Sequence, residues 1–209
     1  MKHRLRNCSV LCIFIVVIFT VGCGGVGKDS PGVTVSATIT PTYNGSNSSS
    51  VDVVQQLCTN SSGTSVQTQP EFFADHMATV LLNAGLINPS NIVKQMTIYL
   101  DSYTISYASS ADSPGAPPMQ SDTRAKTLSF IVTGETTTTS FSVEFVDLIR
   151  KNQYFSDVTG GTFIGPVPLN NYTATYTFQG HAQNGVPITF YAQTDFQIGS
   201  FNNCPAGFF

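Results

Sequence analysis

The sequence contains no tryptophan, and only 10% of its 209 residues are charged, whereas 41% are hydrophobic. A chain with so few charges and so many apolar side chains can bury a core, which excludes disorder throughout its length. Three of the nine Lys and Arg residues lie in the first six positions, so the rest of the chain carries six basic against 12 acidic side chains. This acidic balance argues against a nucleic-acid partner, because phosphate binding requires a basic surface.

Diagnostic catalytic motifs are also missing. The chain has no G-x-S-x-G elbow, H-E-x-x-H helix, EF-hand loop or Walker A sequence. Two histidines, His76 and His181, follow the leader, and we expect His76 to be a hydrogen-bonded structural residue and His181 an exposed turn residue. The sequence therefore predicts neither an enzyme nor a cofactor.

Six carboxylates offer oxygen ligands for calcium, but no D-x-D spacing brings them together locally, so we expect solvated or locally bonded side chains and no metal. They are Asp101, Glu135, Glu144, Asp147, Asp157 and Asp195.

The first 27 residues have the pattern of an export signal. A positive start is followed by a 14-residue apolar run, Cys8 to Val21, which is shorter than the roughly 20 residues of a spanning helix. The sequence Thr20-Val21-Gly22-Cys23 then resembles the lipobox of bacterial lipoproteins, in which small residues admit signal peptidase II and the cysteine thiol receives diacylglycerol. The resemblance implies a signal peptide over 1–22, a membrane anchor on Cys23 and a place in the bacterial cell envelope. The open alternative is an uncleaved signal anchor with an incidental cysteine.

The residue after the predicted lipid acceptor indicates which of the two bacterial membranes holds the protein. Gly24 is not the aspartate that retains some bacterial lipoproteins at the inner membrane, so the resemblance favours the outer membrane. Residues 23–32 have the glycine-rich composition of a flexible tether, and we place a single domain over 33–209.

The predicted export signal gives each of the five cysteines an expected role. Cys8 and Cys12 leave with the leader and Cys23 is the lipid acceptor, so Cys58 and Cys204 remain as a pair in an oxidising compartment. We predict a disulfide between them, which is worth about 4 to 5 kcal/mol by loop-closure entropy.

Most of the remaining chain is predicted to form short strands. Apolar and hydroxyl residues alternate from Val33 to Pro41, and the alternation slips by one residue at Asp101-Ser102, which predicts a β-bulge. The clearest hairpin turns at Asn184-Gly185. We also expect a strand over 51–57, loops over 59–65 and 109–121, and one helical turn over 146–151.

Residues 70–84 fit either a helix or a strand. Thr68 and Glu71 have capping-box spacing, and apolar residues follow at helical offsets, but a run such as Ala78 to Leu82 equally suits a buried strand. We favour the strand. The fold expected is all-β, an antiparallel immunoglobulin-like β-sandwich of seven or eight strands with at most one or two short helices; an eight-stranded barrel is the alternative.

Two tyrosines, Tyr99 and Tyr191, lie in the opposite phase from their apolar neighbours and are predicted to point outward. An exposed tyrosine patch can bind sugar or a partner protein, although isolated outward tyrosines are ordinary on sheets. The function expected is a lipid-anchored, non-catalytic structural or partner-binding module, with an envelope protein as the possible partner. A glycan-binding module is the alternative, followed by an envelope hydrolase with a cleft containing His76 or two close carboxylates.

Overall fold

The computed structural model describes residues 32–62, 65–87, 95–134, 136–160, 169–205 and 208. This part of the chain forms eleven strands and one helix. The strands are β1 Val33–Tyr43, β2 Ser46–Asn47, β3 Ser50–Asp52, β4 Leu57–Ser62, β5 Ser65–Pro70, β6 His76–Leu86, β7 Gln95–Ser109, β8 Asp122–Thr133, β9 Thr137–Val146, β10 Leu169–Ala182 and β11 Pro187–Gly199, and the helix is α1 Leu148–Thr159.

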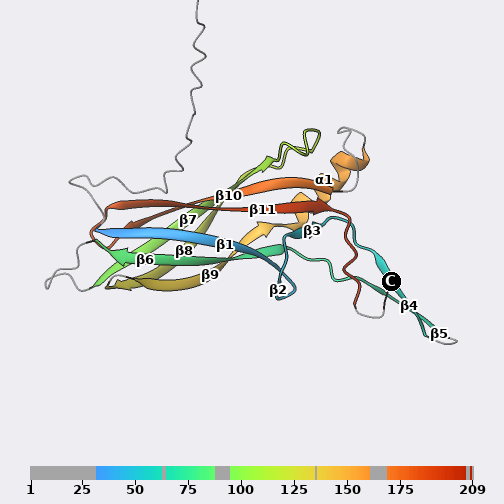
Figure 1. The fold of residues 1–209 in the computed structure, drawn as a ribbon, viewed down its shortest axis with the longest axis horizontal. Coiled ribbons are helices and arrows are strands. Elements are labelled where there is room, and N and C mark those ends of the chain that lie inside the picture. The colour runs from blue at the N-terminus through green and yellow to red at the C-terminus, as the bar shows by residue number, and fades with distance from the viewer. Residues whose placement is uncertain are drawn as a thin grey trace, which may run out of the picture.

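Two packed sheets make the body of the molecule (Figure 1). One has the order β2-β1-β6-β9 and the other the order β3-β11-β10-β7-β8, while β4 and β5 pair only with each other. The predicted all-β sandwich is therefore confirmed, and its two separately hydrogen-bonded sheets distinguish it from a closed barrel. The predicted strand number was too low, because the short strand β2 and the β4–β5 hairpin were not foreseen. The pairing of β3 with β11 is parallel rather than antiparallel.

Alternation along the long strands builds the core. In β1, Val33 and Ile39 face the interior while the threonines between them face solvent, as the period of two predicts. Aromatic side chains fill the centre, and Phe178 packs within 4.9 Å of the ring centroid of Phe190 and 5.9 Å of that of Phe141 on the opposite sheet. These contacts join the two sheets into one continuous hydrophobic core.

The predicted bulge lies in β7. The register of β7 against β8 shifts between Leu100 and Ser102, and its register against β10 shifts between Gln179 and Gly180. A Cβ atom at Gly180 would lie 2.1 Å from the carbonyl oxygen of Tyr99, so only glycine permits this close approach. The bulge re-aims the second half of β7, as the slip in the sequence pattern indicated.

Four local expectations were tested by the structure. Residues 76–86 form strand β6, which confirms the strand reading of the ambiguous segment. The expected strand over 51–57 is confirmed at residues 51–52 but is too long, because β3 ends at Asp52. The expected loop over 59–65 instead falls within the β4–β5 hairpin, which covers the described residues 57–62 and 65–70. The expected single helical turn is the three-turn helix α1, whose N-cap Asp147 accepts a hydrogen bond from the backbone N–H of Arg150.

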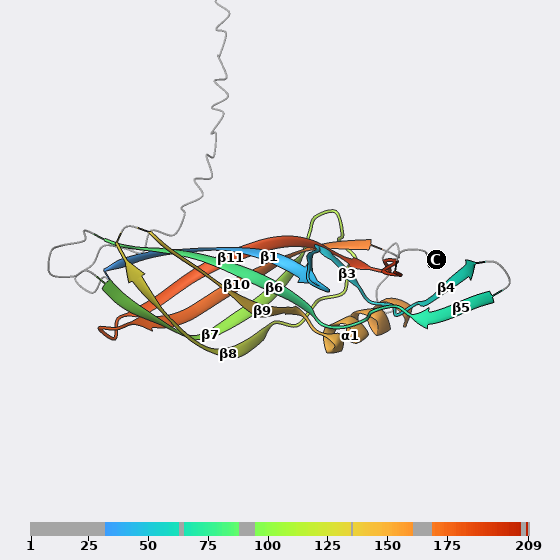
Figure 2. The same ribbon diagram turned by 90° about the horizontal axis from the view of Figure 1, so that it is seen from below.

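The two ends of the sandwich differ. Gly32 and the start of β1 lie at one end, where the backbone of Gly32 accepts from Ile87 and that of Gly134 accepts from Leu86. Helix α1, the β4–β5 hairpin and the C-terminal segment lie at the other end (Figures 1 and 2). The 11 residues of β1 extend about 36 Å along the sandwich from the first end. We call the end with α1 and the hairpin the distal end.

Candidate functional site

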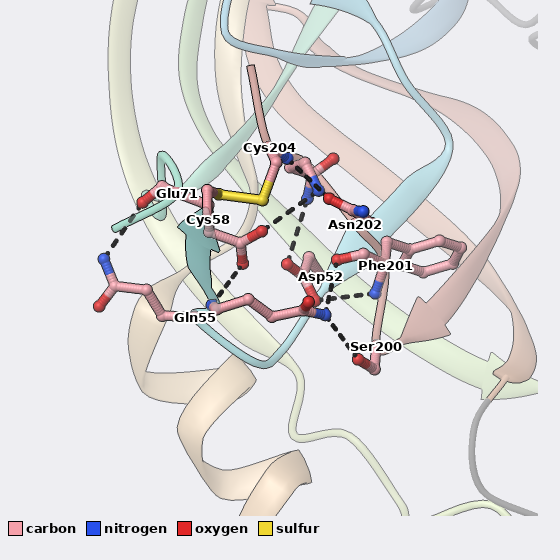
Figure 3. The surroundings of a disulfide bond; sticks show 10 residues. Asp52, Gln55, Cys58, Glu71, Ser200, Phe201, Asn202 and Cys204 are labelled. Atoms are coloured by element: carbon pink, nitrogen blue, oxygen red, sulfur yellow. Dashed lines mark hydrogen bonds between the residues drawn. A yellow bond between two sulfur atoms is a disulfide. The ribbon is translucent and has the colours of Figure 1, made fainter. Parts of the chain in front are cut away.

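The predicted disulfide forms at the distal end (Figure 3). Cys58 at the start of β4 is bonded to Cys204 in the C-terminal segment, across a sequence separation of 146 residues. The bond ties the last residues of the chain to the base of the β4–β5 hairpin. Cys23, the predicted lipid acceptor, lies outside the described residues.

Two buried carboxyl groups lie beside the disulfide. Asp52 and Glu71 are 0% and 2% exposed, and their side chains are hydrogen-bonded to each other. Burial is the largest cause that raises the pKa of Glu71, and the bond to Asp52 adds to it. The raised pKa favours the protonated form of Glu71, whose hydroxyl can donate to Asp52.

This acid pair holds the C-terminal segment to the sandwich. Asp52 accepts hydrogen bonds from the backbone N–H of Phe201 at 3.1 Å and from the Asn203 side-chain amide at 3.1 Å. Glu71 accepts from the backbone N–H of Asn203 at 3.2 Å and from that of Gln56 at 3.0 Å (Figure 3). Both buried carboxyl groups therefore have hydrogen-bond partners, and their role is to hold the chain around them in place.

A buried lysine lies near the pair. The Nζ of Lys151 in α1 donates to the backbone carbonyl of Ala74 at 2.6 Å and lies 4.6 Å from the ring centroid of Phe73 and 5.0 Å from that of Tyr43. Its side chain is 0% exposed. Burial lowers the pKa of Lys151 to about 8, against the opposing effect of Asp52 and other carboxylates.

His76 is buried against the same tyrosine. Its ring stacks on Tyr43 with centroids 4.0 Å apart, and its Nε2 lies 3.0 Å from the carbonyl oxygen of Ser50. Its Nδ1 is buried without a hydrogen-bond partner among the described residues. Burial, with the nearby Lys151, lowers the pKa of His76 to about 3, so the ring is neutral at physiological pH. The histidine is hydrogen-bonded inside the protein, as its sequence context predicted.

The hydrolase alternative required a cleft that contains His76 or two close carboxylates. Asp52 and Glu71 are close, but they and His76 line none of the three described cavities. These groups are interior rather than accessible to a substrate.

The two predicted surface tyrosines are exposed but separate. Tyr99 is 38% exposed and pairs across the sheet with His181, whereas Tyr191 is 61% exposed and pairs with Thr177. Tyr99 stacks on His181 with ring centroids 5.0 Å apart, and the Nδ1 of His181 lies 3.0 Å from Asp101. The tyrosines therefore do not form one row. His181 is 43% exposed by side chain, as predicted, but it lies in β10 before the turn rather than in it.

Five of the six carboxylates considered for calcium lie in the described part of the chain, and each of them has a hydrogen-bond or ion-pair partner there. Glu144 and Asp147 pair with Arg124, Asp101 with His181, Asp195 with Thr173, and Asp157 with Gln153; Glu135 lies outside the described residues.

Arginines and carboxylates link α1 to the sheet. Arg124 lies 2.6 to 3.1 Å from Asp122, Glu144 and Asp147. Arg150 in α1 lies 2.7 Å from Asp147 and 3.4 Å from Asp122. Two guanidinium groups thus meet three carboxylates, and the helix is fixed at the distal end.

A cavity of about 360 Å³ lies between α1 and the 117–120 segment. The tyrosine hydroxyl of Tyr172 donates to the carbonyl of Pro117 at 2.5 Å, and Arg150 Nε donates to the carbonyl of Gln120 at 3.1 Å, so both ends of the segment are fixed. The lining residues are Pro117, Pro118, Met119, Gln120, Ile149, Arg150, Gln153, Tyr154 and Asp157.

Exposed apolar side chains gather at the same end. Eleven large hydrophobic side chains of the described residues are exposed, and six of them belong to the hairpin, to the segment after it, to α1 or to the start of β10. These six are Leu57, Val66, Phe72, Ile149, Phe155 and Leu169.

Sequence reasoning missed this end of the molecule. It placed residues 109–121 correctly in a loop but had no means to pair that loop with α1, because their contact joins segments far apart in the chain. The sequence signals that could have predicted the full length of α1 were Asp147 as an N-cap and Gly160 as a C-terminal stop.

The chain matches no protein-family model, and neither a curated protein nor a solved structure is significantly similar to it. Among the described residues, no helix has the length and apolar character needed to cross a membrane.

Proposed function

We propose that this chain is a lipid-anchored envelope protein whose β-sandwich is a non-catalytic module that binds a protein partner through its distal end. The observation that carries the proposal is that the described part of the chain begins at one end of the sandwich, while the exposed apolar side chains of α1 and the hairpin lie at the other. The sequence places the tether immediately before β1, and β1 begins at the end opposite α1 and the hairpin (Figure 2). A membrane anchor on Cys23 would therefore leave the distal end free to meet a partner.

The chemistry of the distal end supports protein binding. Ile149 is 79% exposed, Val66 69% and Leu57 64%, and solvent-exposed aliphatic side chains gathered at one end are typical of interaction surfaces. The acid pair and the disulfide fix the backbone at the base of the hairpin and in the C-terminal segment. A partner would therefore meet a preformed surface there.

The anchor is tested by Cys23→Ser. Two acyl chains hold a protein stably on a membrane, whereas an unmodified domain has no such attachment. We expect the wild-type protein in the membrane fraction with its leader removed, and the variant to keep its leader and to carry no acyl chain, because signal peptidase II acts at the lipidated cysteine. A wild-type protein that also keeps its leader would indicate an uncleaved signal anchor instead.

The binding end is tested by crosslinking in cells, followed by membrane solubilisation and mass spectrometry. We expect a small set of envelope proteins with the wild type, and at least a tenfold loss of them with Ile149→Asp. Tyr191→Asp is the matched control, since Tyr191 is similarly exposed but lies on the face of the sandwich. Equal loss with both variants, or no specific protein with the wild type, would contradict the proposal. Saturable glycan binding that Tyr99→Ala abolishes would replace it.

A further inference from the structure

The cavity between α1 and the 117–120 segment has chemistry specific enough to name what it binds. We propose that it receives a lysine or arginine side chain of the protein partner, with an apolar neighbour packed beside it. This inference rests on the proposed function, because it specifies the chemistry of the partner at the distal end.

The walls of the cavity suit the stem of a long basic side chain. Pro118 and Met119 lie on one side, and Ile149 and the buried ring of Tyr154 lie on the helix side. A volume of about 360 Å³ lies in the range of small-molecule sites, which is room for a long side chain and part of a second. Lysine and arginine pack their methylene groups on such apolar surface while the charged group extends beyond it.

The positive charge already in the cavity is compensated. Arg150 lies 2.7 Å from Asp147 and 3.4 Å from Asp122, and it donates to the carbonyl of Gln120. Its guanidinium group is therefore held by two carboxylates and a carbonyl, so it has little capacity left to bind an anion or to repel a cation.

Negative charge at the other side of the cavity is not compensated. Asp157 accepts one hydrogen bond, from the side-chain amide of Gln153 at 2.8 Å, and no cation of the described residues forms an ion pair with it. Asp157 also lies in the last turn of α1, which holds no basic residue. The partial negative charge of a helix C-terminus adds to that of the carboxylate. Both favour a cation at this side of the cavity.

The test measures peptide binding to the full chain purified in detergent, with ¹³C-labelled methionine and isoleucine methyl groups observed by NMR. The probes are the acetylated tripeptide amides Leu-Lys-Leu, Leu-Gln-Leu and Leu-Glu-Leu. We expect Leu-Lys-Leu to shift the methyl signals of Met119 and Ile149 with a Kd on the order of 1 mM. Leu-Gln-Leu should bind at least fivefold more weakly, and Leu-Glu-Leu more weakly still.

Asp157→Asn isolates the charge, because asparagine keeps an oxygen that accepts from Gln153. We expect this variant to bind the lysine and glutamine peptides equally, and higher salt to reduce the lysine preference of the wild type. The matched control Asp112→Asn removes an exposed carboxylate that does not line this cavity, and it should keep the preference. Equal binding of all three peptides to the wild type, no binding at all, or a lysine preference unchanged in Asp157→Asn would overturn the inference.

The crosslinking experiment separates this inference from the proposed function. If partners recovered in cells depend on Ile149 but not on Asp157, the distal end binds a protein without using a basic side chain in this cavity. If partners depend on neither residue, the proposed function fails as well.

Discussion

The carboxyl groups of Asp52 and Glu71 are hydrogen-bonded to each other inside the protein, and both hold the C-terminal segment through Asn203. The disulfide between Cys58 and Cys204 fixes the same segment covalently. The C-terminal segment is therefore attached to the distal end in two independent ways, through a covalent bond and through hydrogen bonds to the acid pair.

Glu71→Gln tests the acid pair. The pKa of Glu71 is raised in the folded state, so its contribution to stability is present at low pH and is lost as the pH rises through the folded value. Glutamine has only one oxygen, so the variant loses either the Gln56 or the Asn203 bond, and we expect it to be less stable by about 1–3 kcal/mol at pH 4. The deficit should shrink as the pH rises, because only the wild type loses the proton. Urea unfolding from pH 4 to 8 measures it, and a deficit that grows with pH would contradict a raised pKa of Glu71.

His76→Gln tests the buried histidine. The folded pKa is lowered to about 3 from 6.5, so the unfolded chain binds the additional proton and the native state loses stability as the pH falls between these values. The full effect is about 5 kcal/mol at 1.4 kcal/mol per pKa unit. Glutamine does not titrate, so the variant should show a shallower loss in acid.

The matched control for that experiment is His181→Gln, which replaces a histidine whose side chain is 43% exposed. We expect its pH dependence of unfolding to follow that of the wild type. An acid transition that His76→Gln leaves unchanged would show that the buried ring does not drive it.

Lys151→Met tests the buried ammonium group. The pKa of Lys151 is lowered to about 8, so the unfolded chain holds more protons than the native state between about pH 8 and 10.5. Wild-type stability should therefore gain up to about 3 kcal/mol from this group over that interval. The variant should lack the gain, whereas Lys126→Met should retain it. Parallel stability curves for wild type and Lys151→Met would contradict the buried charge.

Cys58→Ser tests the disulfide. Loop closure over 146 residues is worth about 5 kcal/mol, so the variant should melt many degrees below the wild type. Cys204→Ser should have a similar effect, since either change opens the same loop. Calorimetry under non-reducing conditions measures both, and an unchanged Tm would exclude a stabilising role for the bond.

Much of the fold was predictable because it is local. The period of two in β1 and the slip at Asp101-Ser102 depend on neighbouring residues alone, and both appear in the structure. The turn at Asn184-Gly185 also forms, with Gly185 at φ 80°, although Asn184 does not share the positive φ that a type I′ turn requires.

The distal end was not predictable, because its contacts join segments that are far apart in the chain. Nothing in the sequence around Lys151 shows that its ammonium group would be buried against Tyr43 and Phe73, because those residues precede it by a large part of the chain. The same holds for the cavity, whose two walls come from separate segments. The disulfide is the exception, because the predicted leader and lipid acceptor left only Cys58 and Cys204 to pair.

The most direct measurement places a photoactivated crosslinking amino acid at position 149 and, in a second strain, at position 191 of the full-length protein in living cells. We predict that position 149 captures a protein of the envelope reproducibly, that position 191 does not, and that Cys23→Ser reduces the capture. Capture of the same proteins from both positions, or from neither, would contradict a binding surface at the distal end.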